Sequence, residues 1–272
     1  MREHRICFRT SERTPVLQIF KLLFAAVTVM GVCGAEAQTA PPLIPPRPGY
    51  NFPAKQTLTY AVDWRVFPAG TTVMHLEQQD GDEERISASG DTLGAINLIY
   101  RVSDRFQSSF NRRTGCSAGF AKQLQEGRRQ VSTDLKFDYA QGKALLNEKN
   151  LVKGTSKHSE APVGPCVTDL LSAIFYPAAL TLTPGESFRV PVADAMHTVA
   201  VTMRVEARET VRTPLATYQT IRVQPMADAG VVKARGNIWI WYTDDDRHVP
   251  VQMRARLFWG TITFRLTALE QK

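Results

Sequence analysis

The sequence predicts an all-β domain, mainly antiparallel, in which a curved sheet approaches an open barrel and one main α-helix lies near residues 166–176. Three observations support this fold class. Apolar and polar residues alternate along most of the chain from Lys55 onward, short turn-forming segments interrupt the alternation, and only one segment departs from the two-residue period. A period of two is typical of strands with one buried face.

The first strand is expected just after Lys55, where Leu58, Tyr60, Val62 and Trp64 alternate with polar or small residues. The segment "FPAG" at 67–70 then turns the chain, and "AQGK" at 140–143 does so again. Further strands are expected at 71–77, 86–89, 98–110, 131–139, 144–152, 199–205 and 221–223. Two meanders of strands therefore flank the single helical segment.

The segment "PCVTDLLSAIFY" at 165–176 is expected to be that helix. Val167, Leu170, Leu171 and Ile174 follow the i, i+3, i+4, i+7 spacing of an amphipathic helix. A proline at 177 is expected to end the helix near residue 176. Asp169 would lie in the first turn, where the helix dipole explains a carboxylate better than catalysis does.

Residues 1–37 are interpreted as a signal peptide, with cleavage after Ala37. A basic segment, an apolar run and the sequence "AEAQ" appear in the order of a secretory signal, and the run is shorter than the ~20 residues that a spanning helix needs. Cys33 raises the alternative of a lipid anchor, but Val32 precedes it. Residues 38–54 are interpreted as a proline-rich linker and 55–272 as a single domain. The predicted location is periplasmic or secreted.

Composition limits the partners. The net charge of +7 is modest and spread along the sequence, so nucleic acid is not expected as a partner. The mature chain contains no further stretch that could span a membrane as a helix. No cofactor and no metal site are expected. A lipid or an envelope protein remains the expected partner, and the sequence leaves the oligomeric state open.

Two cysteines, Cys116 and Cys166, remain after the predicted cleavage. An oxidising compartment permits a disulfide bond between them, while two buried free thiols are the alternative. Both cysteines stand in turn-like contexts, "RTGCSAG" and "VGPCVTD", which favours the bridge.

Three consecutive carboxylates, Asp244, Asp245 and Asp246, join an aromatic run to an alternating apolar run. A structural turn is the favoured interpretation, because aspartate side chains bond nearby backbone N–H groups. A cation site ranks second, since the alternating spacing and the distal glutamate of a calcium loop are absent. Acid/base catalysis ranks third.

The last two strands are expected to form a hairpin around "FWGT" at 258–261. The predicted register places Leu257 opposite Ile262 and Met253 opposite Leu266, on a buried face. It also places Arg254 opposite Arg265 on the other face. Two opposed arginines repel, so either an acidic group lies close to them or both extend into solvent.

Three motifs of this sequence resemble those of the DUF3108 family of bacterial envelope proteins. The resemblance covers roughly residues 56–270 and includes an opening hairpin with Trp64 and Gly70. It implies a β-rich envelope domain of unassigned activity and supplies no catalytic residues. The matching motif residues are Trp241, Thr243, Asp245 and Pro250 in the tail, Asp169, Ser172, Ala173 and Tyr176 in the helix, and Thr213, Pro214, Thr220 and Pro225 between them.

The expected function is non-catalytic: binding of an apolar ligand, such as a lipid or acyl chain, or of another envelope component. The expected ligand-binding residues are Tyr60, Trp64, Tyr100, Leu171 and Ile174, although ordinary core packing also explains these side chains. One alternative is a hydrolase acting on cell-envelope material, but the histidines form no catalytic motif with a recognisable spacing. The other alternative is a structural scaffold or assembly partner in the envelope.

Overall fold

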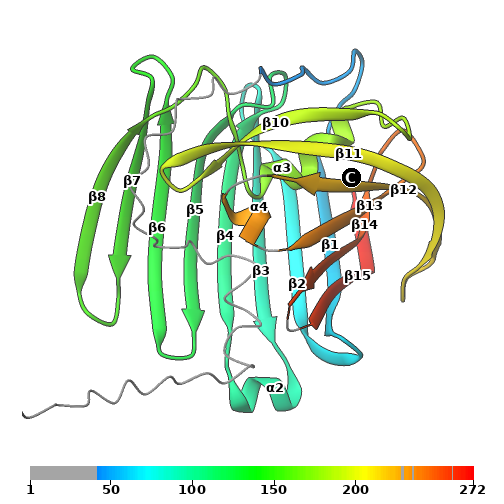
Figure 1. The fold of residues 1–272 in the computed structure, drawn as a ribbon, viewed down its shortest axis with the longest axis horizontal. Helices are drawn as coiled ribbons and strands as arrows, with labels where there is room; N and C mark the ends of the chain where they lie inside the picture. The colour runs from blue at the N-terminus through cyan, green and yellow to red at the C-terminus, as the bar shows by residue number, and fades with distance from the viewer. Residues whose placement is uncertain (1–41, 228–229, 235, 259) are drawn as a thin grey trace, which may run out of the picture.

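The computed structural model describes residues 42–227, 230–234, 236–258 and 260–272. Its strands form one curved sheet in the order β8-β7-β6-β5-β4-β3-β2-β1-β15-β14-β13-β12-β11-β10-β9 (Figure 1). The strands are β1 Lys55–Trp64, β2 Phe67–Gln78, β3 Glu83–Thr92, β4 Ser103–Asn111, β5 Ser117–Glu126, β6 Arg129–Asp138, β7 Lys143–Asn150, β8 Thr155–Pro162, β9 Thr168–Asp169, β10 Ser187–Asp194, β11 His197–Arg212, β12 Thr217–Met226, β13 Asn237–Thr243, β14 Pro250–Leu257 and β15 Gly260–Gln271.

The sheet consists of two meanders that meet where β1 pairs with β15. The first arm runs from β1 to β8 and the second from β15 back to β9, and every neighbouring pair except β9–β10 is antiparallel. Along β1, Leu58, Tyr60 and Val62 are buried at alternate positions, as the two-residue period predicts. The expected all-β, mainly antiparallel fold is confirmed.

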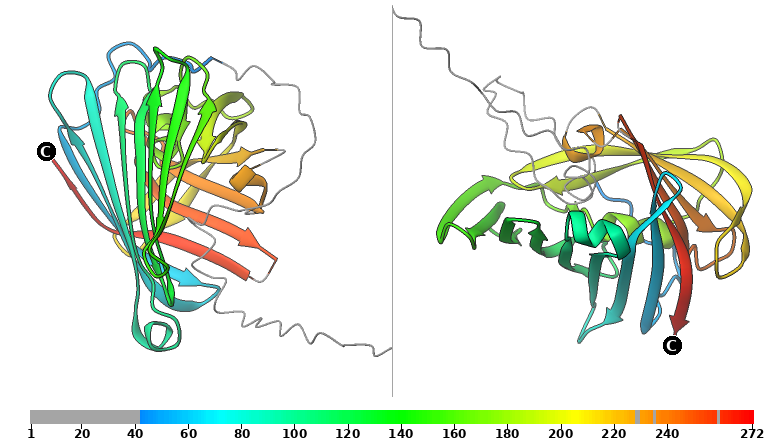
Figure 2. Two further views of the ribbon diagram at one scale, coloured as in Figure 1. Left: turned by 90° about the vertical axis from the view of Figure 1, so that its left-hand side faces the viewer. Right: turned by 90° about the horizontal axis from the view of Figure 1, so that it is seen from below.

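The second arm folds over the first (Figure 2), and β10 and β11 cross the upper part of β4 to β6 (Figure 1). Near the end of the second arm, Ser117 N in β5 donates a hydrogen bond of 2.7 Å to Val167 O, next to β9. The sheet does not close, because the hydrogen-bonded strand order ends at β8 on one side and at β9 on the other.

The helix expected near 166–176 is present, but it is shorter than predicted and begins later. Thr168 and Asp169 form β9, the helix α3 spans Ser172–Phe175, and a 3₁₀ turn, η2, continues through Tyr176–Ala179. Nearly every residue from 167 to 179 is buried, so an apolar period here does not mark one exposed and one buried face. The helix α3 ends at Phe175, close to the predicted end at residue 176, and Pro177 lies in the first positions of the 3₁₀ turn, where a proline sacrifices no hydrogen bond.

Two further short helices lie in connections between strands. The helix α2 spans Gly94–Ile99, so residues 98 and 99, expected at the start of a strand, are helical. The helix α4 spans Gly230–Ala234 between β12 and β13.

The predicted register of the last hairpin is wrong by two residues. Leu257 pairs with Gly260 and Met253 with Phe264, since the connection is tighter than expected. A shift of two keeps each side chain on its expected face, so the buried face is unchanged. Arg265 therefore lies opposite Gln252 and donates a hydrogen bond of 2.6 Å to Asp63 in β1, which supplies an acidic partner.

Residues 42–54, part of the predicted linker, are docked against the domain. Arg47 N donates to Ala179 O at 2.8 Å, and its guanidinium donates to the backbone oxygens of Leu180 and Asp246. Further along, Phe52 packs edge-on against Phe110 with ring centroids 5.4 Å apart. This segment is a strap that joins η2 to the β13–β14 turn.

Candidate functional site

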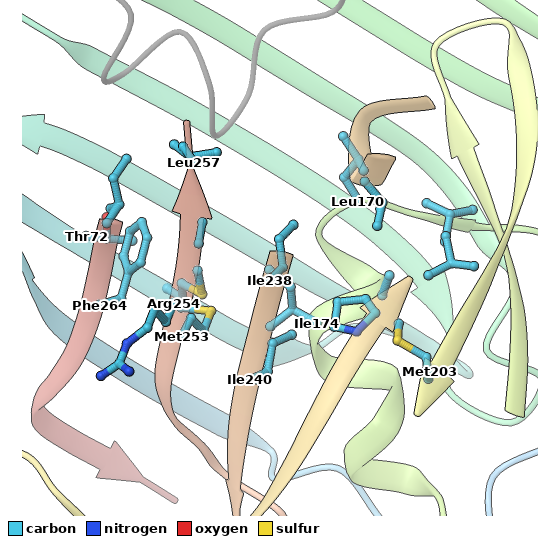
Figure 3. A pocket seen from close by; sticks show the side chains of 18 residues that line it. Thr72, Leu170, Ile174, Met203, Ile238, Ile240, Met253, Arg254, Leu257 and Phe264 are labelled. Carbon is cyan, nitrogen blue, oxygen red and sulfur yellow. The ribbon is translucent and has the colours of Figure 1, made fainter. Parts of the chain in front are cut away.

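An apolar cavity of about 150 Å³ lies between the two arms of the sheet, beside α3 (Figure 3). Strands β2, β10, β11, β12, β13, β14 and β15 contribute to its wall, together with α3 and α4. The residues that line it are Thr72, Met74, Leu170, Ala173, Ile174, Val192, Val201, Met203, Pro225, Val232, Ile238, Ile240, Met253, Arg254, Ala255, Leu257, Ile262 and Phe264.

The alternation of the strands explains this lining. Ile238 and Ile240 on β13, and Met253 and Ala255 on β14, occupy every second position and therefore face the same side of the sheet. Three methionines contribute to the wall, and their flexible thioethers adapt to irregular shapes. Thr72 and Arg254 are the polar members of the set, and the Arg254 guanidinium is directed away from the cavity (Figure 3), 5.3 Å from the Trp241 ring centroid.

Such a cavity can take an alkyl or aromatic group but not a charged one. Its wall offers almost no hydrogen-bonding partner, and a buried ion without a partner is strongly disfavoured. Water is disfavoured for the same reason, since a buried water needs 2–4 polar partners. The cavity runs from Ile174 in α3 to Leu257 at the end of β14.

The structure brings one of the five expected ligand-binding residues, Ile174, to this cavity. Leu171 is fully buried in the core beside it. Tyr60 is also fully buried and donates a hydrogen bond of 2.7 Å to Pro250 O; burial raises the pKa of its phenol, which stays neutral. Trp64 is partly buried against the core, under the guanidinium of Arg65.

Tyr100, the fifth residue, lies at the lower end of the first arm. Its ring packs against Gly127, where an added Cβ would come within 2.6 Å of a ring carbon, so only glycine fits. The expected contacts of Tyr60, Trp64 and Tyr100 with a shared apolar hollow are therefore not formed. The sequence pattern identifies the inward-facing positions of each strand, but the curvature that brings particular strands together depends on the whole sheet.

Asp244, Asp245 and Asp246 form the turn between β13 and β14. Asp245 accepts hydrogen bonds from Thr243 Oγ1 at 2.7 Å and from Arg247 N at 3.1 Å, and its second oxygen pairs with the Arg247 guanidinium at 2.6 Å. Burial opposes ionisation of Asp245, but these hydrogen bonds lower its pKa below the usual value. Asp244 pairs with Arg208 at 2.8 Å. These contacts are those of a structural turn.

The tail-motif residues all contribute to this turn or to the strands around it. Thr243 Oγ1 accepts a hydrogen bond of 2.8 Å from Val249 N, which closes the turn from the other side. The Pro250 carbonyl accepts the hydrogen bond from Tyr60, and the Trp241 indole donates to Glu209. The motif therefore has a structural explanation in this chain.

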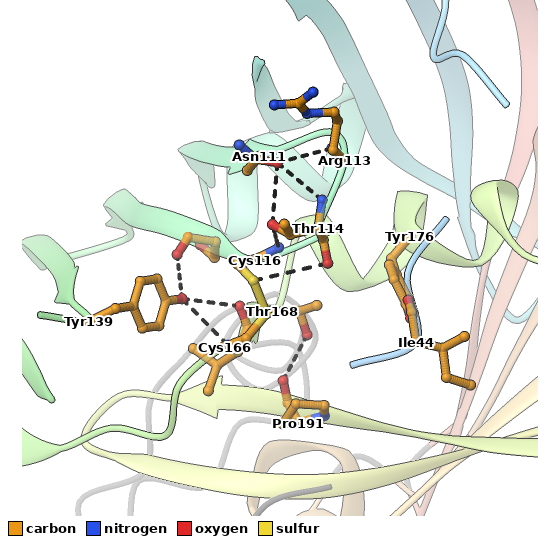
Figure 4. The surroundings of a disulfide bond; sticks show 12 residues. Ile44, Asn111, Arg113, Thr114, Cys116, Tyr139, Cys166, Thr168, Tyr176 and Pro191 are labelled. Atoms are coloured by element: carbon orange, nitrogen blue, oxygen red, sulfur yellow. Dashed lines mark hydrogen bonds between the residues drawn. A yellow bond between two sulfur atoms is a disulfide. The ribbon is translucent and has the colours of Figure 1, made fainter. Parts of the chain in front are cut away.

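The disulfide bond between Cys116 and Cys166 is present, with Cα atoms 5.1 Å apart (Figure 4). Beside it, the Tyr139 hydroxyl donates a hydrogen bond of 2.6 Å to Ser117 O, and Thr168 Oγ1 donates one of 3.0 Å to Pro191 O. The bridge therefore lies where β5, β6 and β10 converge on β9, and it joins the two arms of the sheet.

Asp169, next to this bridge, is fully buried and accepts five hydrogen bonds. Three come from the hydroxyls of Ser108, Ser117 and Ser172, and two from the backbone N–H groups of Leu171 and Ser172. The three serines are at most 1% exposed. A substrate cannot reach this cluster, so its role is to hold α3 and β9 against β4 and β5.

Two other buried carboxyl groups have fewer partners. Glu84 is fully buried, its oxygens have no hydrogen-bond partner, and its closest cation is Arg112 at 3.8 Å. Burial raises the pKa of Glu84 to about 7, although Arg112 opposes the shift. Burial similarly raises the pKa of Asp104 to about 7. Both groups are in the first arm, away from the cavity lining.

Comparison with known proteins agrees with this fold. The model of the family described as "Protein of unknown function (DUF3108)" matches residues 59–267. The crystal structure of a beta-barrel-like protein of the domain of unknown function DUF1849 from Brucella abortus is similar, with a TM-score of 0.58 and 11% identity over 82% of this chain and 99% of that one. At this identity the similarity shows the fold alone.

Two other solved structures are more distant. One is a protein described as exported, with a YmcC-like fold, from Bacteroides fragilis, with a TM-score of 0.37 and 10% identity over 81% of this chain and 98% of that one. The other is described as a lipoprotein from Parabacteroides distasonis, with a TM-score of 0.37 and 9% identity over 80% of this chain and 97% of that one. No curated protein matches the chain. Within the described residues, no helix has the length and apolar character needed to cross a membrane.

Proposed function

The chain belongs to the DUF3108 family, and we propose that this member is a non-catalytic envelope protein whose sheet binds the alkyl part of a lipid in the cavity beside α3. The observation that carries the proposal is the cavity itself. Protein interiors are normally close-packed, yet here Met74, Met203 and Met253 surround a space that no side chain fills.

The size of the cavity limits which ligands could bind in it. Its volume of about 150 Å³ is below the ~300–1,000 Å³ of a site that encloses a whole drug-sized ligand. An apolar cavity of roughly 150 Å³ stays dry and admits a molecule the size of benzene. We therefore propose that it takes the end of an acyl chain, or a small apolar group, and not a complete lipid.

The envelope location is part of the same proposal. The predicted signal peptide, residues 1–37 with cleavage after Ala37, lies outside the described residues. Support comes from the bond between Cys116 and Cys166, because disulfide bonds persist in oxidising compartments and are rare in the cytosol.

The two alternatives receive less support. A hydrolase needs an accessible nucleophile beside a base, but the hydroxyls of Ser108, Ser117 and Ser172 are sealed around Asp169. A scaffold that recruits partners by strand addition needs an exposed edge without charges. The edge strand β8 carries Lys157, His158 and Glu160, which is typical of an edge protected from such pairing.

A cavity-filling substitution tests the proposal. Delipidated protein should bind a dansyl-labelled fatty acid with increased fluorescence, and Ala173→Leu should weaken that binding about tenfold or more, because its added methyl groups occupy the space. Ala178→Leu is the matched control, since Ala178 is a buried alanine of the adjacent 3₁₀ turn that does not line the cavity.

Thermal melts should show that both variants fold. Equal probe binding by Ala173→Leu and Ala178→Leu, or no binding by the delipidated wild-type protein, would refute the proposal.

A further inference from the structure

One end of the sheet carries an unusual surface. We name the connections β1–β2, β3–β4, β5–β6, β7–β8 and β14–β15 the lower rim, since they lie together at the bottom of the molecule in Figure 1. Seven of the ten exposed large apolar side chains of the described residues are in the lower rim, and an eighth, Phe67, begins β2 next to it. The seven are Val66, Leu93, Leu98, Ile99, Leu151, Val152 and Phe258.

These side chains are strongly exposed. Leu98 is 88% exposed, Phe258 is 91% exposed and Val66 is 81% exposed. Single exposed apolar residues are normal on a protein surface, but neighbouring ones mark a site of interaction. The β14–β15, β1–β2 and β3–β4 connections are neighbours, since Arg65 N donates to Thr261 O and Leu93 N donates to Ala69 O. The apolar residues fall on four of the five connections, so the feature belongs to the rim and not to one turn.

The helix α2 projects farthest from this end (Figure 2) and is held firmly at its base. Thr92 Oγ1 accepts a hydrogen bond of 2.9 Å from Val102 N and donates one of 3.0 Å to Asn97 Oδ1. Tyr100 N donates to Ile96 O at 2.8 Å, and the Tyr100 ring is buried. The exposed positions of Leu98 and Ile99 therefore follow from a fixed local fold.

The charge of the lower rim indicates what it contacts. Arg65, Arg101, Arg128 and Lys153 are exposed on these connections, and the connections contain no acidic residue. The opposite rim carries both signs, since Asp82 on the β2–β3 connection pairs with Arg112 and Arg113, and Asp245 on the β13–β14 turn pairs with Arg247. A surface that combines apolar side chains with neighbouring basic ones is typical of proteins that bind an anionic bilayer.

We propose that the lower rim docks on an anionic phospholipid bilayer, with Leu98, Ile99 and Phe258 inserted among the headgroups and the basic residues contacting lipid phosphates. This inference goes beyond the proposed function, because docking on a membrane does not require a ligand in the cavity. The cavity reaches Leu257, which adjoins Phe258 in the lower rim, so a docked molecule would present its cavity on the membrane side.

Vesicle binding tests the proposal. The exported protein should sediment with vesicles of phosphatidylcholine and phosphatidylglycerol in equal parts and much less with phosphatidylcholine alone, and high salt should reduce binding. The double variant Leu98→Ser/Ile99→Ser should bind about tenfold more weakly or less, because it removes two large apolar side chains from the interface. Arg101→Glu/Lys153→Glu should show a similar loss on anionic vesicles.

The β11–β12 connection, which is not part of the lower rim, supplies the matched controls. The variants Leu215→Ser and Arg212→Glu change this connection and should bind vesicles like the wild type. Ala173→Leu should also retain vesicle binding, which separates this proposal from that of the cavity ligand.

Two results would overturn docking. One is sedimentation of the Leu98→Ser/Ile99→Ser variant equal to that of the wild type. The other is a wild-type protein that does not sediment with anionic vesicles but forms a dimer, while the Leu98→Ser/Ile99→Ser variant stays monomeric. That result would show that the lower rim is a contact between two copies of the chain.

Discussion

Ser117 Oγ donates a hydrogen bond of 2.6 Å to Asp169 Oδ2. Ser117 directly follows Cys116, and Asp169 lies three residues after Cys166, so this bond and the disulfide join the same two segments. The disulfide is a covalent bond that a reductant can break, whereas the hydrogen bond from Ser117 to Asp169 is buried. Together they hold the end of the second arm against the first.

Replacing Asp169 with alanine should be strongly destabilising. The change would leave three serine hydroxyls and two N–H groups without their acceptor, and buried donors without a partner are destabilising. We expect a decrease of about 3–5 kcal/mol in the free energy of unfolding, measured by urea denaturation. Asp134→Ala, at a partly exposed position of β6, should change it by no more than about 0.5 kcal/mol. Similar losses in both variants would contradict the assigned role of Asp169.

Removal of the disulfide should also destabilise the chain. The bridged residues are 50 positions apart, and a loop of that length corresponds to about 4 kcal/mol in the chain-entropy model. A Cys116→Ser/Cys166→Ser variant should therefore unfold at lower urea concentration than the oxidised wild type. The unfolded, unreduced wild-type protein should show no free thiol from these two residues, and reaction of both with a thiol reagent would rule out the bridge.

Asp245→Ala should have a moderate effect, because Asp245 caps the turn through Thr243 and Arg247. We expect a loss of about 0.5–2 kcal/mol in unfolding free energy, as for other capping carboxylates. Asp246 is the matched control, since its interaction in the turn is made by its backbone oxygen, so Asp246→Ala should be nearly neutral. Micromolar calcium should leave the melting temperature of the wild type unchanged. A rise of several degrees would instead identify a cation site.

Because of Glu84, the free energy of unfolding should decrease as the pH rises. Its pKa is about 7 in the folded protein against 4.5 for the free side chain, so the unfolded chain releases the proton first. The contribution of protonated Glu84 to the free energy of unfolding is therefore complete below pH 4.5 and is lost as the pH rises to about 7. Comparing wild type with Glu84→Gln between pH 5 and pH 8 isolates this group, because Asp104 and His248 titrate in both proteins. We expect the wild type to lose roughly 1–3 kcal/mol more than the variant over that range, and parallel curves would show that Glu84 is ionised when folded.

The sequence by itself determined the fold class, the expected pairing of Cys116 with Cys166 and the turn at Asp244 to Asp246. All three depend on local or pairwise features. A period of two specifies strands, aspartates favour turns, and the two cysteines that remain after the predicted cleavage have one possible intramolecular partner each. The family resemblance was also visible in the sequence, since its motif residues build turns and buried contacts that are encoded over a few positions.

Only the tertiary structure decided the length of α3, the register of the last hairpin and the place of the cavity. The segment at 167–179 is buried on all sides, so its apolar spacing could not distinguish a helix from a short strand followed by a helical turn. A two-residue slip keeps the same faces buried, so the pattern that predicts the hairpin cannot choose between the two registers. The lining of the cavity, from Met74 in β2 to Met253 in β14, depends on how far the sheet curls, which is a property of all its strands together.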